Sequence, residues 1–170
     1  MVELKEFLTR FLLMFVILYI FFNLPEIAEP LDCQFTDFLY PLKEIVAISS
    51  TWLLRLFGNT VFLDGVTISV GAVRFTIISA CTGVVSFSIF SGLIYATPMK
   101  RKGYYLALSF PVFLVWNILR VTLTLSFGAE LVELLHSSFW LISIFIVLGL
   151  YMLVLKKEGI YLGKEDKTGE

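Results

Sequence analysis

The chain has 170 residues, of which 58% are hydrophobic and only 16% are charged, and its mean hydropathy is +0.89. This composition excludes an ordinary soluble domain, and the length excludes two domains, so we expect one membrane domain over 1–170 with a flexible tail at 158–170. A net charge of −1 gives no indication of nucleic-acid binding. Two cysteines and one histidine are too few for a disulfide framework or a metal site, and we expect no cofactor.

The first part of the chain predicts one membrane span and one shorter helix. Residues 7–24 are long and apolar enough for a transmembrane helix that ends at Pro25, with no cleavage site behind it. An acidic segment with a single lysine, Lys43, follows over 25–44. Residues 45–57 are too few to cross a bilayer and contain polar side chains, which favours an interfacial or re-entrant helix.

Residues 58–78 change to the period of a β-strand. Apolar and polar residues alternate over 66–70 and 73–77, and Gly71-Ala72 between them suits a two-residue turn. Asp64-Gly65 marks another turn just before. A hairpin would expose polar edges, so we expect it outside the hydrocarbon core, where it delivers Cys81 to the membrane surface.

The remaining chain predicts three further apolar helices. Residues 81–99 form a span that precedes the basic cluster 100–102, and 104–127 form a second span with a bend at Pro111. Residues 129–155 continue as a helix that ends at a second basic pair. The expected fold is an all-α integral membrane helix bundle, with about four spans, an interfacial helix and a small β-hairpin on the outer side.

Three unusual side chains share one expected depth in this bundle. The positive-inside rule places the basic residues 100–102 and 156–157 in the cytoplasm. Cys81, Arg120 and His136 each lie 19 or 20 residues from one of these clusters. That separation corresponds to about 29 Å of helix, close to the hydrocarbon thickness of about 30 Å. The sequence therefore predicts that they meet near the outer boundary of the cell membrane.

Cys81 is a candidate nucleophile. Its expected place at a helix N-terminus favours a thiolate. The alternative interpretation is a cysteine that only packs in the core. Thr82 and Gly83 permit close approach of another chain, and the N–H groups there are candidates to bind an oxyanion. Cys33, in the acidic loop, is either a free, non-catalytic thiol, which we favour, or a disulfide partner of Cys81.

Arg120 and His136 are the candidate partners. A guanidinium inside an apolar span is costly, and Asn117 and Thr124 lie on the same helical face, which a snorkelling arginine would not need. His136 is the imidazole available as a base near neutral pH, with Glu133 one turn earlier to orient it. An interfacial histidine that contacts lipid headgroups is the alternative interpretation.

At these residues the chain resembles the exosortase/archaeosortase family of multi-pass membrane cysteine transpeptidases. The matching features, over roughly 50–140, are Ala80-Cys81-Thr82-Gly83 followed by Ser86, Asn117-Ile118-Leu119-Arg120-Val121, His136 and the strand-like stretch 58–78. The chain departs from the family in two ways: Thr82 stands where serine is more common, and fewer spans are expected than in larger members.

The resemblance implies a sorting enzyme of the cell membrane whose active site faces outward. Its partners would be membrane-anchored proteins that end in a short motif, a transmembrane helix and a basic tail. The enzyme would cut near the motif and pass the new C-terminus to an acceptor such as a lipid. In that role Cys81 attacks the scissile carbonyl, Arg120 stabilises the oxyanion or the thiolate, and His136 transfers the proton.

Two other functions remain open at this point. A non-enzymatic scaffold or transporter subunit would use Arg120 in a structural ion pair with Glu133, and would tolerate replacement of Cys81. A thiol-redox protein would need Cys33 as much as Cys81. The transpeptidase needs Cys81 and Arg120 but not Cys33.

Overall fold

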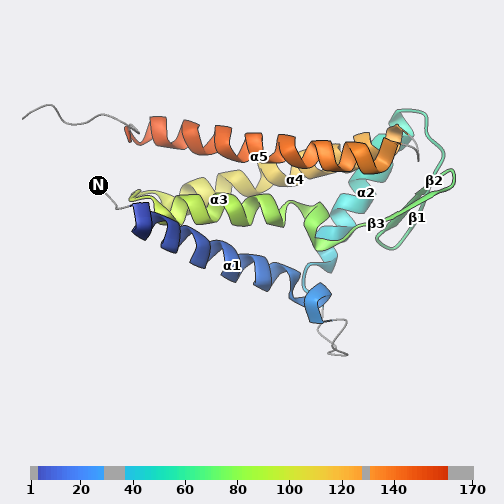
Figure 1. The fold of residues 1–170 in the computed structure, drawn as a ribbon. Coiled ribbons are helices and arrows are strands. Elements are labelled where there is room, and N and C mark those ends of the chain that lie inside the picture. The colour runs from blue at the N-terminus through green and yellow to red at the C-terminus, as the bar shows by residue number, and fades with distance from the viewer. Residues whose placement is uncertain (1–3, 29–36, 128–130, 161–170) are drawn as a thin grey trace, which may run out of the picture.

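The computed structural model describes residues 4–28, 37–127 and 131–160, apart from the side chains at positions 132, 133, 136 and 137. The elements in chain order are α1 (Leu4–Ala28), α2 (Tyr40–Leu56), β1 (Val61–Asp64), β2 (Thr67–Val70), β3 (Val73–Thr76), η2 (Ser79–Thr82), α3 (Val84–Ala96), α4 (Lys102–Ser126) and α5 (Val132–Lys157). Helices α1, α3, α4 and α5 run alongside one another, and α2 and the sheet lie at one end of this bundle (Figure 1).

Within the described part of the chain, three helices are long and apolar enough to cross a membrane: α1, α4 and α5. The span that we expected over 81–99 is broken into the short 3-10 helix η2 and the 13-residue helix α3. Gly83 has a φ of +90°, which ends η2 and redirects the chain. Thr97, which precedes Pro98, is extended and ends α3. At about 20 Å, α3 is shorter than the hydrocarbon core of about 30 Å.

The helix bounds differ from the expected ones at two places. Pro25 was expected to end the first helix, but α1 includes it and continues to Ala28. The extra turn has tertiary partners that offset the proline, because Glu26 bonds to Lys43 and to the backbone of Ser79. Helix α2 begins at Tyr40 rather than at residue 45, with a proline in its first turn, where proline is tolerated.

The expected hairpin is present and gains a third strand. Strands β2 and β3 pair antiparallel with Val70 opposite Val73, around Gly71 at a φ of +57°. Strand β1 pairs with the other edge of β2, with Asp64 opposite Thr67, so the order is β1-β2-β3. The expectation of a two-stranded hairpin was therefore incomplete, because β1 reads Val61-Phe62-Leu63 without a period of two.

The core at the sheet end of the bundle includes Cys81. One cluster of buried apolar residues joins α2, the sheet, η2 and α4: Val46, Ala47, Leu54, Val61, Ile68, Ile77, Cys81, Val121 and Leu125. Farther along, α1 lies directly on α3, since a Cβ at Gly92 would be 2.9 Å from Cδ2 of Phe11. Phe90 of α3 and Phe113 of α4 stack edge to face at 5.6 Å. The first of these clusters, which joins α2, η2 and α4, holds η2 between the two helices.

The basic clusters lie at the end of the bundle opposite to η2. The start of α1, the α3–α4 connection and the end of α5 gather at one end, whereas η2, α2 and the sheet lie at the other (Figure 1). At the basic end, Lys102 Nζ donates to the carbonyl of Tyr95 at 2.7 Å, and Lys157 Nζ lies 5.5 Å from the centre of the Tyr104 ring. The bundle thus separates Cys81 from the basic residues along its length.

Candidate active site

Cys81 is held in the tight turn η2, at the head of α3. Its side chain is buried, with 3% of the residue exposed. The Cys81 N–H donates to the carbonyl of Ile78 at 2.9 Å, and the Thr82 hydroxyl donates to the carbonyl of Ser79 at 2.7 Å. Cys81 was expected to open a helix, but it precedes the first residue of α3 by three positions, and its own N–H is already bonded.

Gly83 brings this turn against α4. A Cβ at Gly83 would lie 2.8 Å from the carbonyl oxygen of Phe113 and 3.0 Å from Nδ2 of Asn117. Asn117 Nδ2 donates to the same carbonyl at 2.8 Å. The space beside Gly83 is therefore taken by α4 of this chain, whereas the expectation concerned the approach of another chain, which stays a prediction.

The expected polar stripe of α4 is buried inside the bundle. Asn117 is 2% exposed, Arg120 is 4% exposed and Thr124 is fully buried. These residues follow the helical spacing that puts them on one face. Asn117 of this face lies beside Gly83, and Arg120 lines a cavity with Ala80 of η2. A snorkelling arginine would lie on the outer surface of the protein, so burial argues against that alternative for Arg120.

Burial raises the pKa of the Cys81 thiol, which lies in η2 outside the long helices α1, α4 and α5. The backbone hydrogen bond at Ile78 and the positive charge of Arg120 oppose this rise without cancelling it. Burial thus works against the thiolate that the helix N-terminus was expected to favour, because desolvation outweighs the nearby charges. A nearby base that accepts the proton would therefore help Cys81 to act as a nucleophile.

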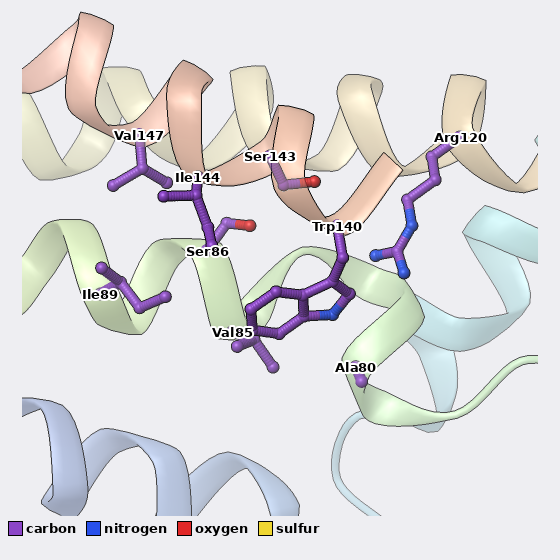
Figure 2. A pocket seen from close by; sticks show the side chains of 9 residues that line it. All are labelled: Ala80, Val85, Ser86, Ile89, Arg120, Trp140, Ser143, Ile144 and Val147. Carbon is purple, nitrogen blue, oxygen red and sulfur yellow. The ribbon is translucent and has the colours of Figure 1, made fainter. Parts of the chain in front are cut away.

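A small cavity of about 10 Å³ adjoins the Arg120 guanidinium, close to the volume that one water molecule requires. Its lining comes from η2, α3, α4 and α5: Ala80, Val85, Ser86, Ile89, Arg120, Trp140, Ser143, Ile144 and Val147. Figure 2 shows the guanidinium reaching from α4 toward η2, beside the Trp140 indole. Of the expected residues, the structure thus brings Arg120 and the Cys81 turn to one place.

Ser143 and Trp140, which line this cavity, were not singled out from the sequence. Ser143 accepts a hydrogen bond from Nε1 of Trp116 at 2.8 Å and donates to the carbonyl of Phe139 at 2.9 Å. Trp140 lies one turn before Ile144 on the same face of α5. Both lie in a charge-free apolar run, where the only available signal was a tryptophan and a serine at helical spacing.

A polar cluster that is hydrogen-bonded to the Cys81 turn was also not predicted from the sequence. Glu26 Oε1 accepts the backbone N–H of Ser79 at 2.6 Å and the ammonium of Lys43 at 2.8 Å. Lys43 Nζ also donates to Asp37 Oδ2 at 2.9 Å. The sequence contained one signal for this cluster, because Lys43 is the single cation in an acidic segment.

Three expected residues lie outside what the structure describes. The side chains of His136 and Glu133 are among those excluded, and Cys33 belongs to an excluded segment. The backbone at position 136 is part of α5, one helical turn before Trp140. The roles expected of these residues stay predictions.

One comparison with known proteins finds a match. A family model described as transmembrane exosortase matches residues 6–156, which include η2, the polar stripe of α4 and most of α5. No curated protein and no solved structure matches the chain. Because the match covers most of the sequence, the chain belongs to the transmembrane exosortase family.

Proposed function

We propose that this membrane protein is a cysteine transpeptidase that cleaves C-terminal sorting signals. Its substrates are membrane-anchored proteins that end in a short motif, a transmembrane helix and a basic tail. The new C-terminus passes to a lipid or another cell-surface acceptor. The observation that carries the proposal is a buried thiol, Cys81, within electrostatic reach of a buried guanidinium, Arg120. Cleavage by a thiol needs this pairing of a nucleophile with a group that stabilises negative charge.

The first half-reaction forms a thioester on Cys81. His136 accepts the thiol proton, and the sulfur bonds to the carbonyl carbon of the scissile peptide bond. The carbonyl oxygen becomes an oxyanion, which the Arg120 guanidinium holds through two parallel N–H groups. The C–N bond then breaks, and the leaving amine takes its proton from the His136 imidazolium.

The second half-reaction transfers the acyl group. A hydroxyl or amine of the acceptor bonds to the thioester carbon and gives its proton to His136. The C–S bond breaks, and the sulfur regains that proton to restore the Cys81 thiol.

The position of Cys81 suits a substrate that is itself anchored in the membrane. The Cys81 turn, η2, lies at the end of the bundle that carries the sheet, away from the basic clusters 100–102 and 156–157. If those residues are cytoplasmic, Cys81 lies near the outer boundary of the bilayer. There the extruded part of an anchored substrate presents its peptide bond, while its transmembrane helix remains in the lipid.

The test is substrate processing in cells that carry single substitutions at matched enzyme levels. The reporter is a secreted protein of the same genome that ends in a motif, an apolar helix and a basic tail. Cys81→Ala accumulates the uncleaved reporter, whereas Cys33→Ser, the control for the second thiol, processes it normally. Normal processing by Cys81→Ala contradicts the transpeptidase and supports a scaffold. Loss of processing in Cys33→Ser supports a redox function instead.

A further inference from the structure

The ion cluster of Glu26, Lys43 and Asp37 joins three segments that are distant in sequence. Glu26 lies in the last turn of α1, Asp37 precedes α2, and Lys43 lies in the first turns of α2. Lys43 Nζ donates to both carboxylates, at 2.8 Å to Glu26 and 2.9 Å to Asp37. Only 7% of the Lys43 side chain is exposed, against 29% for each carboxylate. A lysine so deeply buried requires such partners.

The two carboxylates keep the ammonium charged. Burial by itself would lower the pKa of Lys43, but the hydrogen bonds and charges of Glu26 and Asp37 more than offset it and raise the pKa. Asp37 is in turn held by the N–H of Leu39, which donates to Oδ1 at 3.1 Å. The cluster is therefore fixed at Asp37 and directs one carboxylate, that of Glu26, toward η2.

Glu26 connects this cluster to the turn that carries Cys81. Its Oε1 accepts the backbone N–H of Ser79, the first residue of η2, at 2.6 Å. The carbonyl of the same Ser79 accepts the Thr82 hydroxyl at 2.7 Å. Ser79 is thus held through both of its backbone groups, and Cys81 lies between Ser79 and Thr82. A charge-assisted hydrogen bond to a backbone N–H is about twice as strong as a neutral one.

We propose that Glu26 is a positioning residue for Cys81, which it holds in place through the Ser79 N–H, and that Lys43 and Asp37 orient Glu26 for this role. The proposal rests on the proposed function, since it treats Cys81 as the nucleophile. It assigns a task to a buried ion cluster that takes no part in the chemical steps. Without the Glu26 acceptor, the η2 turn loosens and the Cys81 sulfur is no longer held in one position near the charge of Arg120.

A pair of substitutions at one position tests the acceptor oxygen of Glu26, which the Ser79 N–H and Lys43 Nζ share. Glu26→Gln and Glu26→Met both remove the charge and keep a similar length, but only glutamine offers an oxygen to the Ser79 N–H. The readout is the rate at which N-ethylmaleimide alkylates Cys81 in the full chain, in a Cys33→Ser background that leaves Cys81 as the sole thiol. Glu6→Met in the exposed part of α1 is the matched control.

The expected result is a difference between the two variants. Alkylation in Glu26→Met is faster than in Glu26→Gln by about fivefold or more, because a buried turn without its acceptor opens more often. Glu6→Met leaves the rate unchanged. Equal rates in the methionine and glutamine variants would overturn the proposal. This readout needs no substrate, so it fails or succeeds separately from the transpeptidase function.

A second measurement covers the case in which Glu26→Met does not fold. Hydrogen exchange of the peptide 77–83 is compared between the unaltered chain and Glu26→Gln, because a neutral amide accepts more weakly than a carboxylate. Exchange is faster in the glutamine variant, and unchanged exchange overturns the proposal. Reporter processing in Glu26→Gln is slower than in the unaltered chain, in line with the alkylation data. A purely structural cluster would instead lower the amount of enzyme, without changing the rate of Cys81 alkylation or the rate of reporter processing.

Discussion

Gly83 and Asn117 are in direct contact, since a Cβ at Gly83 would lie 3.0 Å from Asn117 Nδ2. Gly83 follows the Cys81 turn, and Asn117 lies three residues before Arg120 on the same buried face of α4. This contact therefore sets the distance between the segment that carries the thiol and the helix that carries the guanidinium. A side chain larger than hydrogen at position 83 would separate them.

Gly83→Ala is expected to destabilise the protein and to impair processing. The φ of +90° costs an alanine about 1–2 kcal/mol, and its Cβ would lie 2.8 Å from the Phe113 carbonyl, which adds a clash. Gly58→Ala is the matched control, because Gly58 has a φ of +82° but open space around it. Thermal unfolding of the detergent-purified variants checks this. A midpoint for Gly83→Ala no lower than that for Gly58→Ala would contradict the close packing.

Arg120→Lys is expected to fail in processing although it retains the charge. A flexible ammonium does not reproduce two parallel N–H bonds to an oxyanion, and the loss of one such donor costs about 10²-fold or more in rate. Arg55→Lys is the control, since Arg55 is exposed and donates to the carbonyl of Val61 at 3.3 Å. Reporter cleavage at matched protein levels distinguishes them. If Arg120→Lys cleaves as fast as Arg55→Lys, the guanidinium has no specific role.

His136→Gln is expected to lower processing most at neutral pH. Burial raises the pKa of the Cys81 thiol, so at neutral pH the thiol is protonated and needs a base, whose loss costs about 10²–10⁴-fold. As the pH rises toward the pKa of the thiol, more thiolate forms without a base, and the deficit narrows. Processing rates of purified enzyme across the neutral and alkaline range check this. A deficit that stays constant with pH would exclude His136 as the base.

The topology of the bundle predicts which positions are accessible from outside the cell. Arg74 is exposed on the sheet, and Arg101 is exposed in the basic cluster at the other end. By the positive-inside rule, Arg74→Cys reacts with a membrane-impermeant thiol reagent in intact cells and Arg101→Cys does not. Both substitutions are made in a Cys33→Ser background. Labelling at position 101 but not at position 74 would invert the orientation.

The sequence predicted those parts of the fold whose signal is local. The alternation over 66–70 and 73–77 identified β2 and β3, and long apolar runs identified α4 and α5. The break at Gly83 was missed, because 81–99 carries no charged residue and is long enough to be predicted as one span. The extension of α1 beyond Pro25 likewise depends on tertiary contacts of Glu26.

The grouping of the Cys81 turn with Arg120 was predictable from the sequence, but the surroundings of the site were not. Counting residues from the basic clusters predicted one depth for Cys81 and Arg120, and in the structure Arg120 lines a cavity with Ala80, the neighbour of Cys81 in η2. The same counting says nothing about lateral contacts, so Trp140 was missed. The bond from Ser79 to Glu26 joins residues 53 apart in the chain, and no local pattern reports such a contact.

The central claim is that Cys81 forms a thioester with the substrate, and trapping that intermediate tests it most directly. Purified enzyme is incubated with the reporter and hydroxylamine, whose nitrogen bonds to the thioester carbon and releases the Cys81 thiol. The account predicts a reporter fragment that ends in a hydroxamate, detected by mass spectrometry, and no such fragment with Cys81→Ala at the same protein level. A hydroxamate that forms equally with Cys81→Ala, or cleavage by the unaltered enzyme without any hydroxamate, would contradict covalent catalysis at Cys81.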